Sequence, residues 1–468
     1  MRAGFVYSHF LLTRRCWRPT RYVSLCRALV FALSFLAVAL VELPASPPAA
    51  AQGQATQAAG DNLVKFVILS RHGVRAPIPK QDELDRWTTN QTPWPAWYCG
   101  GGPDYMKACD RGQLTPKGRT LARQMGTYYK KYLDMLLPQN CPADDQVFFW
   151  ADLDERTKST SIALLHGFRP NCDIARYFHT TSKPTDRIFH PVDGANCKLD
   201  VKAAENAILS RVPNRDLTAY VTNSLGAERT IAQSSLKCCK QALCNNICGS
   251  SAATCTLPGL PTCLAPEADK LPLGGGLRIA STFAELLLLE YANGFPSKHV
   301  GWGIARDQMI QTFRLHTAAF DLEQRTPYIA KLQGSRLLRK VVLALQGVYD
   351  QKEGSAPANA KFVAYVGHDT NIANVAAMLG LSWEQKPDYQ RDQTPPAGAL
   401  VFELHSILGS RFVFAWYVAQ SLEEMRSANG KRPVLTRVPI PGCGNGDLCA
   451  LDEFVKLVEQ ALDSDCSQ

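Results

Sequence analysis

Residues 63–77 read LVKFVILSRHGVRAP, an apolar run that stops abruptly at a cluster of basic side chains. Apolar and β-branched residues bounded by Gly and Pro predict a buried β-strand over residues 63–70. Arg71, His72 and Arg75 follow at once, although like charges held close together repel one another. The run therefore predicts a strand in the core of the fold, and the basic residues after it predict a site for an anion.

Two later segments repeat this design of a strand followed by polar residues. Residues 146–152 (QVFFWAD) and 361–367 (KFVAYVG) are apolar runs, and each leads into a sequence with helical spacing. Strands that alternate with helices predict an α/β fold, in which helices flank both faces of a mixed, mostly parallel sheet. Ligands of such sheets bind beyond the carboxyl ends of the strands. We therefore expect one site built from the polar residues after the three strands, which are Arg71, His72, Arg75, Arg156, His368 and Asp369.

The stretch between the second and third strands has a different pattern. Residues 198–324 have largely helical spacing, and residues 277–295 are the clearest helix. We expect an inserted, mainly α-helical domain there. It would separate two parts of an α/β catalytic domain, residues 52–197 and residues 325–468.

Four single positions carry predictions about local structure. The helix expected over residues 114–137 has Thr115 as its N-cap and Pro116 at its first position. The helix after the third strand is expected to end at Gly380, which suits a C-terminal cap. Lys65, inside the first strand, is expected to be exposed.

The first 51 residues have the pattern of a secretory leader. Arginines precede an apolar run at residues 28–43, and an Ala-rich site ends at Ala51. An uncleaved membrane anchor is the alternative. However, the run has 16 residues with Glu42 near its end, and a spanning helix needs ~20. We expect cleavage after Ala51 and an exported protein, periplasmic or secreted, that is not bound to a membrane.

The charge of the chain depends on this leader. The formal net charge is +9, but residues 1–51 contain six Arg and one Glu, so the remainder carries +4. A charge this small does not indicate a nucleic-acid partner. With 46% hydrophobic and 20% charged residues, the composition is typical of a soluble globular protein. We expect a monomer whose partner is a small molecule, and attraction for anions must come from local arginines.

Fourteen of the sixteen cysteines lie after residue 51, as expected for an exported, oxidised protein. Two pairs bracket short turn-rich segments and resemble local disulfides, namely Cys99 with Cys109 and Cys443 with Cys449. Six more lie within residues 238–263, namely Cys238, Cys239, Cys244, Cys248, Cys255 and Cys263. A zinc site is the alternative for these six, but their spacing repeats no CxxC pair and the cluster contains no His. We favour disulfides there and leave the pairing open.

Three arginines and two histidines can converge on one pocket only at a high electrostatic cost unless an anion joins them. A phosphoryl group fits, because the planar guanidinium matches phosphate oxygens in paired hydrogen bonds. A histidine beside bound phosphate can attack phosphorus and hold it covalently. The leaving oxygen then needs a proton, for which Asp369 is the nearest candidate. We expect no metal and no cofactor, since arginines can neutralise the charge on the phosphoryl oxygens.

Two motifs resemble one known family. RHGVRAP (71–77) resembles the RHGxRxP signature of the histidine acid phosphatases, and GHDTN (367–371) resembles their C-terminal His-Asp motif. Stretches such as ADLDERTKST and HVGWG resemble the branch of bacterial periplasmic phytases and glucose-1-phosphatases, over nearly the whole mature chain. The resemblance implies a phosphoglycerate mutase-like α/β core and hydrolysis of phosphate monoesters through a phosphohistidine.

The resemblance also implies roles for the motif residues. It implies that His72 is the nucleophile, that Asp369 is the proton donor and that His368 assists phosphate binding. The phosphate-binding arginines that it implies are Arg71, Arg75 and Arg156. The disulfides that it implies join Cys141 to Cys172, Cys197 to Cys466 and Cys443 to Cys449. By the same resemblance, Cys99, Cys109 and part of the cluster at residues 238–263 look like additions in this chain.

The resemblance weakens where the substrate is selected. Glu285 resembles a pocket residue of the phytate-cleaving members, but Ile78 stands where those members carry threonine. An apolar side chain there forgoes a hydrogen bond to a highly charged substrate, so phytate, sugar phosphates and general monoesters all stay open. Two other functions are alternatives: a phosphate-ester binding protein without turnover, and a phosphoglycerate mutase-like phosphotransferase.

The remaining histidines after the leader have no motif around them, and we expect structural or surface roles for them. They are His166, His179, His190, His299, His316 and His405. The aromatic-rich residues 87–98 are either a packed loop or part of the pocket rim.

Overall fold

The computed structural model of the protein describes residues 61–100, 107–138, 141–175, 177–178, 185–192, 196–249, 251–267, 269–444 and 448–468. The expected signal segment, residues 1–51, lies outside this part of the chain. Within the described ranges, no helix combines the length and the apolar character needed to cross a membrane.

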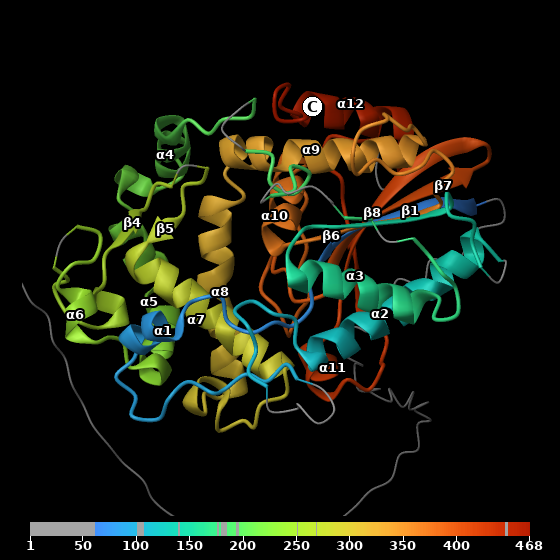
Figure 1. Cartoon of the computed structure of the whole chain (residues 1–468). Coiled ribbons are helices and arrows are strands. Elements are labelled where there is room, and N and C mark those ends of the chain that lie inside the picture. Colours follow the sequence, from blue (N-terminus) through green and yellow to red (C-terminus); the bar gives the residue numbers. More distant parts are fainter. Residues whose placement is uncertain are drawn as a thin grey trace, which may run out of the picture. The chain divides into compact units, whose positions relative to one another are not determined.

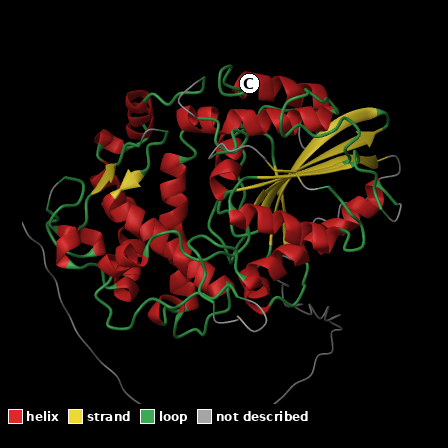
Figure 2. Ribbon diagram, viewed as in Figure 1, coloured by secondary structure: helices red, strands yellow, loops and turns green. Residues whose placement is uncertain are grey.

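A mixed sheet forms the centre of the α/β part (Figures 1 and 2). Its central strands β1, β6 and β2 are parallel, and they are the three strands that the sequence predicted. β7 joins the other side of β1 in the antiparallel sense. The strands in spatial order are β10 (Cys449–Ala450), β8 (Ser410–Ala419), β7 (Ala399–Ile407), β1 (Asp61–Arg71), β6 (Phe362–Gly367), β2 (Val147–Ala151) and β3 (Tyr177–Phe178), and β9 (Val434–Val438) pairs with β8.

Helices cover both faces of this sheet because its central strands are apolar on both sides. In β1, Phe66 and Ile68 lie in one hydrophobic cluster, and Val67 and Leu69 lie in the cluster on the opposite face. The helices on the first face are α2 (Pro116–Leu136) and α3 (Glu155–Phe168), and those on the second are α9 (Pro327–Gln346), α10 (Asp369–Met378) and α12 (Leu451–Ala461). The predicted α/β fold, with a mixed and mostly parallel sheet flanked by helices, is confirmed.

A second group of helices has its own hydrophobic core. α7 is buried along most of its length, because α5 and α8 both pack against it. The elements of this group are α4 (Val201–Leu209), α5 (Leu217–Leu236), α6 (Gln241–Cys244), α7 (Gly275–Ala292), α8 (Arg306–Glu323) and the strands β4 (Thr262–Leu264) and β5 (Leu273–Gly274). The sequence did not predict the short antiparallel β4–β5 pair. The domain boundaries drawn from the sequence stay a prediction.

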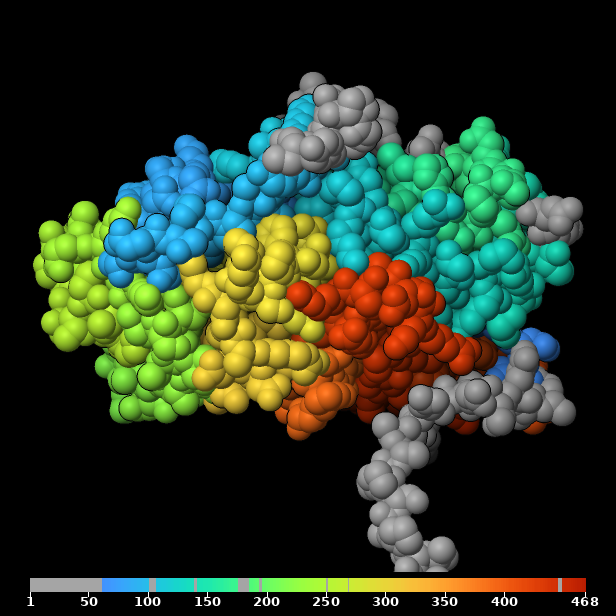
Figure 3. Space-filling model, turned by 90° about the horizontal axis from the view of Figure 1, so that it is seen from below, coloured from blue at the N-terminus to red at the C-terminus, as the bar shows by residue number. Residues whose placement is uncertain are grey.

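The segment that follows β1 packs onto these helices rather than onto the sheet. It contains α1 (Gln81–Trp87), and Figure 3 shows this blue segment on the surface beside the green and yellow helices. Trp94 is buried, with its ring 4.6 Å from that of Trp302 and 6.2 Å from that of Phe283. Around Trp94, the aromatic-rich stretch is therefore a packed loop. A further short helix, α11 (Leu422–Ser427), contacts α7.

The local predictions had mixed outcomes. The hydroxyl of Thr115 accepts a hydrogen bond from the Gly118 amide at 3.0 Å, which confirms the predicted N-cap of α2. α10 ends at Met378, and Gly380 follows the cap residue Leu379 with a φ of +64°. The amide of Gly380 donates to the Ala377 carbonyl at 3.2 Å and that of Leu381 to the Ala376 carbonyl at 2.8 Å, which confirms the predicted C-terminal glycine cap. The prediction of an exposed Lys65 was wrong, because its Nζ is buried and donates to the carbonyls of Ala358 at 3.0 Å and Ala360 at 2.7 Å. Burial lowers the pKa of Lys65 to about 8.

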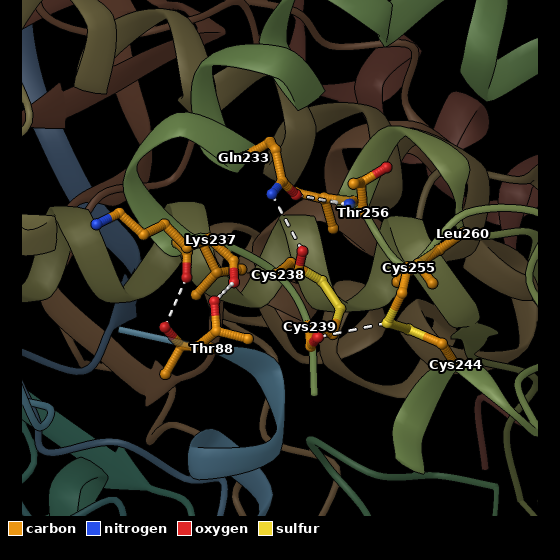
Figure 4. The surroundings of a disulfide bond; sticks show 12 residues. Thr88, Gln233, Lys237, Cys238, Cys239, Cys244, Cys255, Thr256 and Leu260 are labelled. Carbon is orange, nitrogen blue, oxygen red and sulfur yellow. Dashed lines mark hydrogen bonds between the residues drawn. A yellow bond between two sulfur atoms is a disulfide. The ribbon is translucent and has the colours of Figure 1, made fainter. Parts of the chain in front are cut away.

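All fourteen described cysteines form disulfides. Around the bond between Cys244 and Cys255, Gln233 joins neighbouring loops, since its Nε2 donates to the Cys238 carbonyl at 3.1 Å (Figure 4). Its Oε1 accepts from the Leu257 amide at 2.6 Å. The bonded pairs are Cys99–Cys109, Cys141–Cys172, Cys197–Cys466, Cys238–Cys239, Cys244–Cys255, Cys248–Cys263 and Cys443–Cys449.

Candidate active site

The pairing of the three parallel strands brings their polar ends together. Arg71 at the end of β1 is the register partner of Gly367 at the end of β6. The amide of His72 donates to the Gly367 carbonyl at 2.9 Å, and the amide of Asp152, just after β2, donates to the Val366 carbonyl at 3.0 Å. Residues nearly 300 positions apart in the sequence thus become neighbours at one edge of the sheet.

His72 is held by its own loop in a defined orientation. Its Nδ1 lies 2.8 Å from the Gly73 carbonyl. A carbonyl only accepts hydrogen bonds, so Nδ1 carries the proton and Nε2 keeps its lone pair. The Gly73 amide donates to Thr160 Oγ1 at 2.9 Å, and a side chain at position 73 would meet the Gly118 carbonyl. The glycine of the RHG motif is therefore required by the close approach of α2.

The surroundings of His72 keep its imidazole neutral. Burial is the largest effect that lowers its pKa, and the charges of Arg156, Arg71 and Arg75 lower the pKa further, to well below 6.5. Its side chain is 2% exposed. A neutral imidazole with a free Nε2 lone pair is the nucleophilic form of histidine.

Two carboxylates balance the arginines that follow β1. Arg71 Nη2 lies 2.8 Å from Asp369 Oδ2 and also contacts Glu285 Oε1, while its Nη1 donates to the Thr394 carbonyl at 2.5 Å. Arg75 Nη2 lies 3.6 Å from the same Glu285 oxygen. Burial lowers the pKa of Arg75 to about 10 although Glu285 opposes that effect, so the guanidinium stays charged.

Asp369 is the first residue of α10, and its Oδ1 accepts a hydrogen bond from the Thr370 amide at 2.9 Å. Burial would raise its pKa, but the charge of Arg71 and weaker contributions from its neighbours outweigh burial and lower the pKa to about 2. Asp369 is therefore a carboxylate while it contacts Arg71. It can act as an acid only when an anion draws Arg71 away from it.

Arg156 and His368 form the other side of the pocket. Arg156 Nη2 lies 2.7 Å from Asp154 Oδ2 and 3.4 Å from His368 Nδ1. His368 Nε2 lies 2.6 Å from Asp152 Oδ2, and the rings of His72 and His368 are 5.6 Å apart. Burial lowers the pKa of His368 although Asp152 opposes it, so the ring is neutral and can accept from Arg156 at Nδ1. His368 thereby links Arg156 to the end of β2.

Sequence reasoning missed three residues of this site. Asp152 is bonded to His368 and also lies 2.9 Å from His190 Nε2. His316 Nε2 lies 3.8 Å from Glu285 Oε2. Asp152 carried a usable signal, because it directly follows β2 at the edge where ligands bind. His190 and His316 had no such signal, because only long-range folding places them against site residues, and the structural or surface role expected for them stays a prediction.

The other motif-free histidines lie elsewhere. His166 and His299 are exposed, and His405 lies 2.8 Å from Asp61 and 3.1 Å from Glu403. His179 falls outside the described residues.

The two residues expected to select the substrate occupy different positions. Glu285, in α7, is 6% exposed and contacts Arg71, so it is buried beside the arginine cluster rather than on the surface. Ile78 is 40% exposed. A Cβ at Gly112 would lie 3.4 Å from Ile78 Cγ1 and 3.2 Å from Arg156 Nη1, which places Ile78 close to the Arg156 side of the pocket. Arg111 Nε donates to the Ile78 carbonyl at 2.6 Å and fixes that segment.

One group of side chains has the donors that a metal ion could use. The ligating atoms of Asp152, His190 and His368 all lie within 4.8 Å of one another. Two imidazoles and one carboxylate form a donor set that suits zinc and similar ions. The two imidazole–carboxylate contacts are also ordinary hydrogen bonds, and they hold Asp152 as the charged partner by lowering its pKa against the effect of burial. These residues need no ion to be satisfied.

Comparison with known proteins gives the class of this one. Residues 62–415 match the histidine phosphatase superfamily (branch 2). This match covers well over half of the chain, so the protein belongs to that family. The family resemblance read from RHGVRAP and GHDTN is confirmed.

The most informative relatives are bacterial phosphatases. Phytase AppA of Escherichia coli (strain K12) is 33% identical over 430 residues, which cover 86% of this chain and 93% of that protein. Glucose-1-phosphatase of Salmonella typhimurium is 29% identical over 430 residues, which cover 88% and 95%. The structure of Hafnia alvei phytase in complex with tartrate has a TM-score of 0.77 at 33% identity and covers 88% of this chain and 100% of its own.

Proposed function

We propose that this protein is an acid phosphatase that hydrolyses phosphate monoesters in two steps, through a phosphohistidine on His72. The observation that carries the proposal is the neutral, buried imidazole of His72 with three arginines and a carboxyl group around it. Family membership and the phytase and glucose-1-phosphatase relatives support the same reaction.

In the first step, the Nε2 lone pair of His72 attacks phosphorus, and the bond between phosphorus and the ester oxygen breaks. Arg71, Arg75 and Arg156 bind the three phosphoryl oxygens that do not leave and neutralise the charge that develops on them. Asp369 gives its proton to the departing alkoxide or phenoxide oxygen. The products are the free alcohol and phosphohistidine, with Asp369 as a carboxylate.

In the second step, a water molecule attacks the phosphohistidine. Asp369 now acts as the base and accepts a proton from that water, while the bond between phosphorus and Nε2 breaks. His72 regains its lone pair, and inorganic phosphate leaves. His368 keeps Arg156 in place through both steps, because its Nδ1 and Nε2 bridge Arg156 and Asp152.

Asp369 must gain a proton before the first step. The pKa of about 2 in the empty pocket reflects Arg71 at 2.8 Å. A phosphate dianion that binds Arg71 takes over its hydrogen bonds and adds negative charge beside the carboxyl group. Both changes raise the pKa of Asp369, because like charges disfavour the ionised form. Substrate binding therefore creates the acid that the reaction needs.

The test of the reaction is acid-labile labelling by the substrate phosphoryl group. After rapid quenching with a phosphate-labelled ester, wild-type protein should carry the label, and His72→Ala should carry none and should not hydrolyse p-nitrophenyl phosphate. Absence of wild-type turnover from acidic to neutral pH would favour a phosphate-ester binding protein instead. Formation of an isomeric phosphate ester rather than free phosphate would favour a mutase-like phosphotransferase.

The natural substrate is a small phosphate monoester, and phytate and sugar phosphates are the two classes that we propose. The relatives named phytase support the first class, and those named glucose-1-phosphatase support the second. Values of kcat/KM for phytate, glucose 1-phosphate and an aryl phosphate, measured on one preparation, decide between them.

We also propose that the protein is exported and acts as a monomer outside the cytoplasm, periplasmic or secreted. Seven disulfides among the described residues support an oxidising compartment. Cell fractionation followed by N-terminal sequencing tests export and cleavage after Ala51. Light scattering during size-exclusion chromatography tests the monomer.

A further inference from the structure

Two buried polar atoms face each other across the pocket wall without hydrogen-bond partners. Glu285 Oε2, on α7, and His316 Nε2, on α8, lie 3.8 Å apart, and neither has a hydrogen bond to any described residue. Glu285 is 6% exposed and His316 is 9% exposed. Buried polar atoms without partners are rare and costly. We therefore expect these two atoms to come within hydrogen-bond distance in another state of the site.

The remaining polar atoms of both residues already have partners. Glu285 Oε1 contacts Arg71 and lies 3.6 Å from Arg75, so this carboxylate balances two arginines in the empty pocket. His316 Nδ1 lies 3.1 Å from Ser281 Oγ, and the His316 ring lies 4.4 Å from the ring of Phe320. The imidazole is thus fixed on one side and faces Glu285 with the other.

Substrate binding changes the charge balance between Glu285 and the two arginines. At this step the inference rests on the proposed function. When a phosphate dianion takes the hydrogen bonds of Arg71 and Arg75, Glu285 loses the charges that compensate it. A buried carboxylate without a partner, close to a dianion, is strongly disfavoured. His316 is the titratable base that lies within 4 Å of Glu285 Oε2 among the described residues.

We propose that phosphate binding is coupled to uptake of a proton by His316, which then pairs with Glu285 and holds that carboxylate away from the phosphate. The proton comes from solvent, and no other bond changes. The imidazolium donates from Nδ1 to Ser281 Oγ and from Nε2 to Glu285 Oε2, which requires a movement of about 1 Å to reach hydrogen-bond distance. His316 is therefore a positioning residue that acts through Glu285.

The charged groups around His316 agree with a neutral ring before binding. They are Glu285 on α7, Asp369 at the start of α10, and Arg71 and Arg75 in and after β1. Burial lowers the pKa of His316, and the two arginines add to that effect, whereas the two carboxylates oppose it. At pH 6.5 the ring is thus mostly neutral and can accept a proton. A bound dianion raises its pKa.

The test uses sulfate as the probe, because sulfate keeps its two negative charges between pH 4 and 8 and cannot take up the proton itself. Binding is measured by calorimetry at pH 6.5 in two buffers of different ionisation enthalpy, which counts the protons that the protein gains. Asp369→Asn is the background, because it removes the other carboxyl group beside Arg71. In this variant we expect uptake of about one proton, and sulfate affinity should weaken by up to about tenfold per pH unit as the pH rises.

Two double variants test where this proton goes. In Asp369→Asn/His316→Gln the uptake should fall to nearly zero, because the amide can donate to Glu285 but cannot be protonated. In Asp369→Asn/Glu285→Gln it should also vanish although His316 is intact, because no carboxylate needs a partner. This second variant serves as the test if the first fails to fold, as thermal unfolding would show.

The outcomes separate this inference from the proposed function. Unchanged uptake in either double variant, or no uptake in Asp369→Asn, would overturn the role of His316. Wild-type hydrolysis of p-nitrophenyl phosphate is measured separately: turnover without proton uptake refutes only this inference. Proton uptake without turnover refutes only the proposed function. A wild-type protein that binds no sulfate would count against both.

Discussion

Arg71 lies between two carboxylates, and these contacts affect the ionisation of the candidate catalytic groups. Asp369 and Glu285 both contact its guanidinium, which is fully buried. The charge of Arg71 keeps the pKa of Asp369 low against the effect of burial, whereas the pKa of His72 is lowered first by burial and then by the charges of Arg156, Arg71 and Arg75. In the proposed reaction, the arginine cluster thus favours a neutral His72, and Asp369 becomes an acid only when phosphate binds the arginines.

Replacement of Asp369 by Asn should reveal its role through the leaving group. We expect kcat/KM, which reports the steps up to phosphoryl transfer to His72, to fall about 10²–10⁴-fold for an alkyl phosphate, whose leaving oxygen must be protonated. The loss should be much smaller for p-nitrophenyl phosphate, because nitrophenolate leaves without a proton. Wild-type kcat should fall as the pH rises through the raised pKa of Asp369 in the complex. An alkaline optimum, or an equal loss of kcat/KM on both substrates, would contradict the acid role.

Replacement of Ile78 by Thr tests the substrate rim. The added hydroxyl can bond a phosphate oxygen of a highly charged substrate, so kcat/KM for phytate should rise about fivefold, as one partly exposed hydrogen bond of about 1 kcal/mol allows. The value for p-nitrophenyl phosphate should stay within about twofold of the wild type. Ile78→Val is the matched control, because it keeps a β-branched apolar side chain. An equal gain in Ile78→Val would show that bulk, and not the hydroxyl, is responsible.

A metal ion could be bound by Asp152, His190 and His368, whose ligating atoms lie close together. The proposed reaction does not require a metal ion. We expect dialysis against EDTA to leave kcat unchanged within error, because the arginines supply the positive charge at the phosphoryl oxygens. The measurement is p-nitrophenyl phosphate hydrolysis before and after dialysis, with added zinc as a comparison. A large loss that zinc restores would require a different mechanism.

At the scale of elements, the close packing of α2 on α3 supports the site, because α2 lies against the RHG loop and α3 carries Arg156. A side chain at Gly126 would meet the Leu164 backbone, and one at Gly167 would meet the Arg123 backbone. Glycine thus lets the two helices approach closely. This packing keeps Thr160, which accepts from the Gly73 amide, in position.

Replacement of Gly126 by Ala should therefore destabilise the protein. We expect the free energy of unfolding to fall by about 1–3 kcal/mol, because backbone atoms must move apart. Gly226→Ala, in α5, is the control, since a Cβ there has no heavy atom within 4 Å. It should leave stability unchanged or raise it by up to about 1 kcal/mol. Thermal unfolding of both variants and of the wild type measures these changes in stability. Equal changes in the two variants would count against the packing argument.

Secondary structure was predicted correctly from the sequence where it depends on residues that are adjacent in the chain. The strand over residues 63–70 and the Thr115 cap follow from local pattern, and both are present. The prediction that Lys65 is exposed failed because its environment depends on residues that are distant in the chain. Its amine is held by carbonyls of residues 358 and 360, which no local pattern places next to β1.

At the scale of the whole molecule, the disulfides join segments at very different sequence separations. Cys197 and Cys466 are 269 residues apart, whereas Cys99 and Cys109 are 10 apart. A crosslink restricts the unfolded chain more when it closes a longer loop. The long-range bond ties the segment before α4 to the segment after α12.

Removal of each bond by paired Cys→Ala substitution should show this difference. We expect the free energy of unfolding to fall by about 5 kcal/mol without Cys197–Cys466 and by about 3 kcal/mol without Cys99–Cys109. Urea unfolding of both variants and of the wild type gives the values. A smaller loss for the long-range pair than for the short one would mean that loop closure does not govern stability here.

Residues adjacent in the sequence were enough to predict the fold class and the family, and they marked the six motif residues from Arg71 to Asp369 as candidates. These predictions were possible because buried strands, helix caps and the RHGxRxP pattern are each recognised from residues that are adjacent in the sequence. Tertiary contacts were needed to bring Asp152, His190 and His316 against the candidate site and to place Glu285 beside the arginines. Those contacts depend on helices and loops that meet across long sequence separations, and the electrostatics of the site depend on their distances and burial.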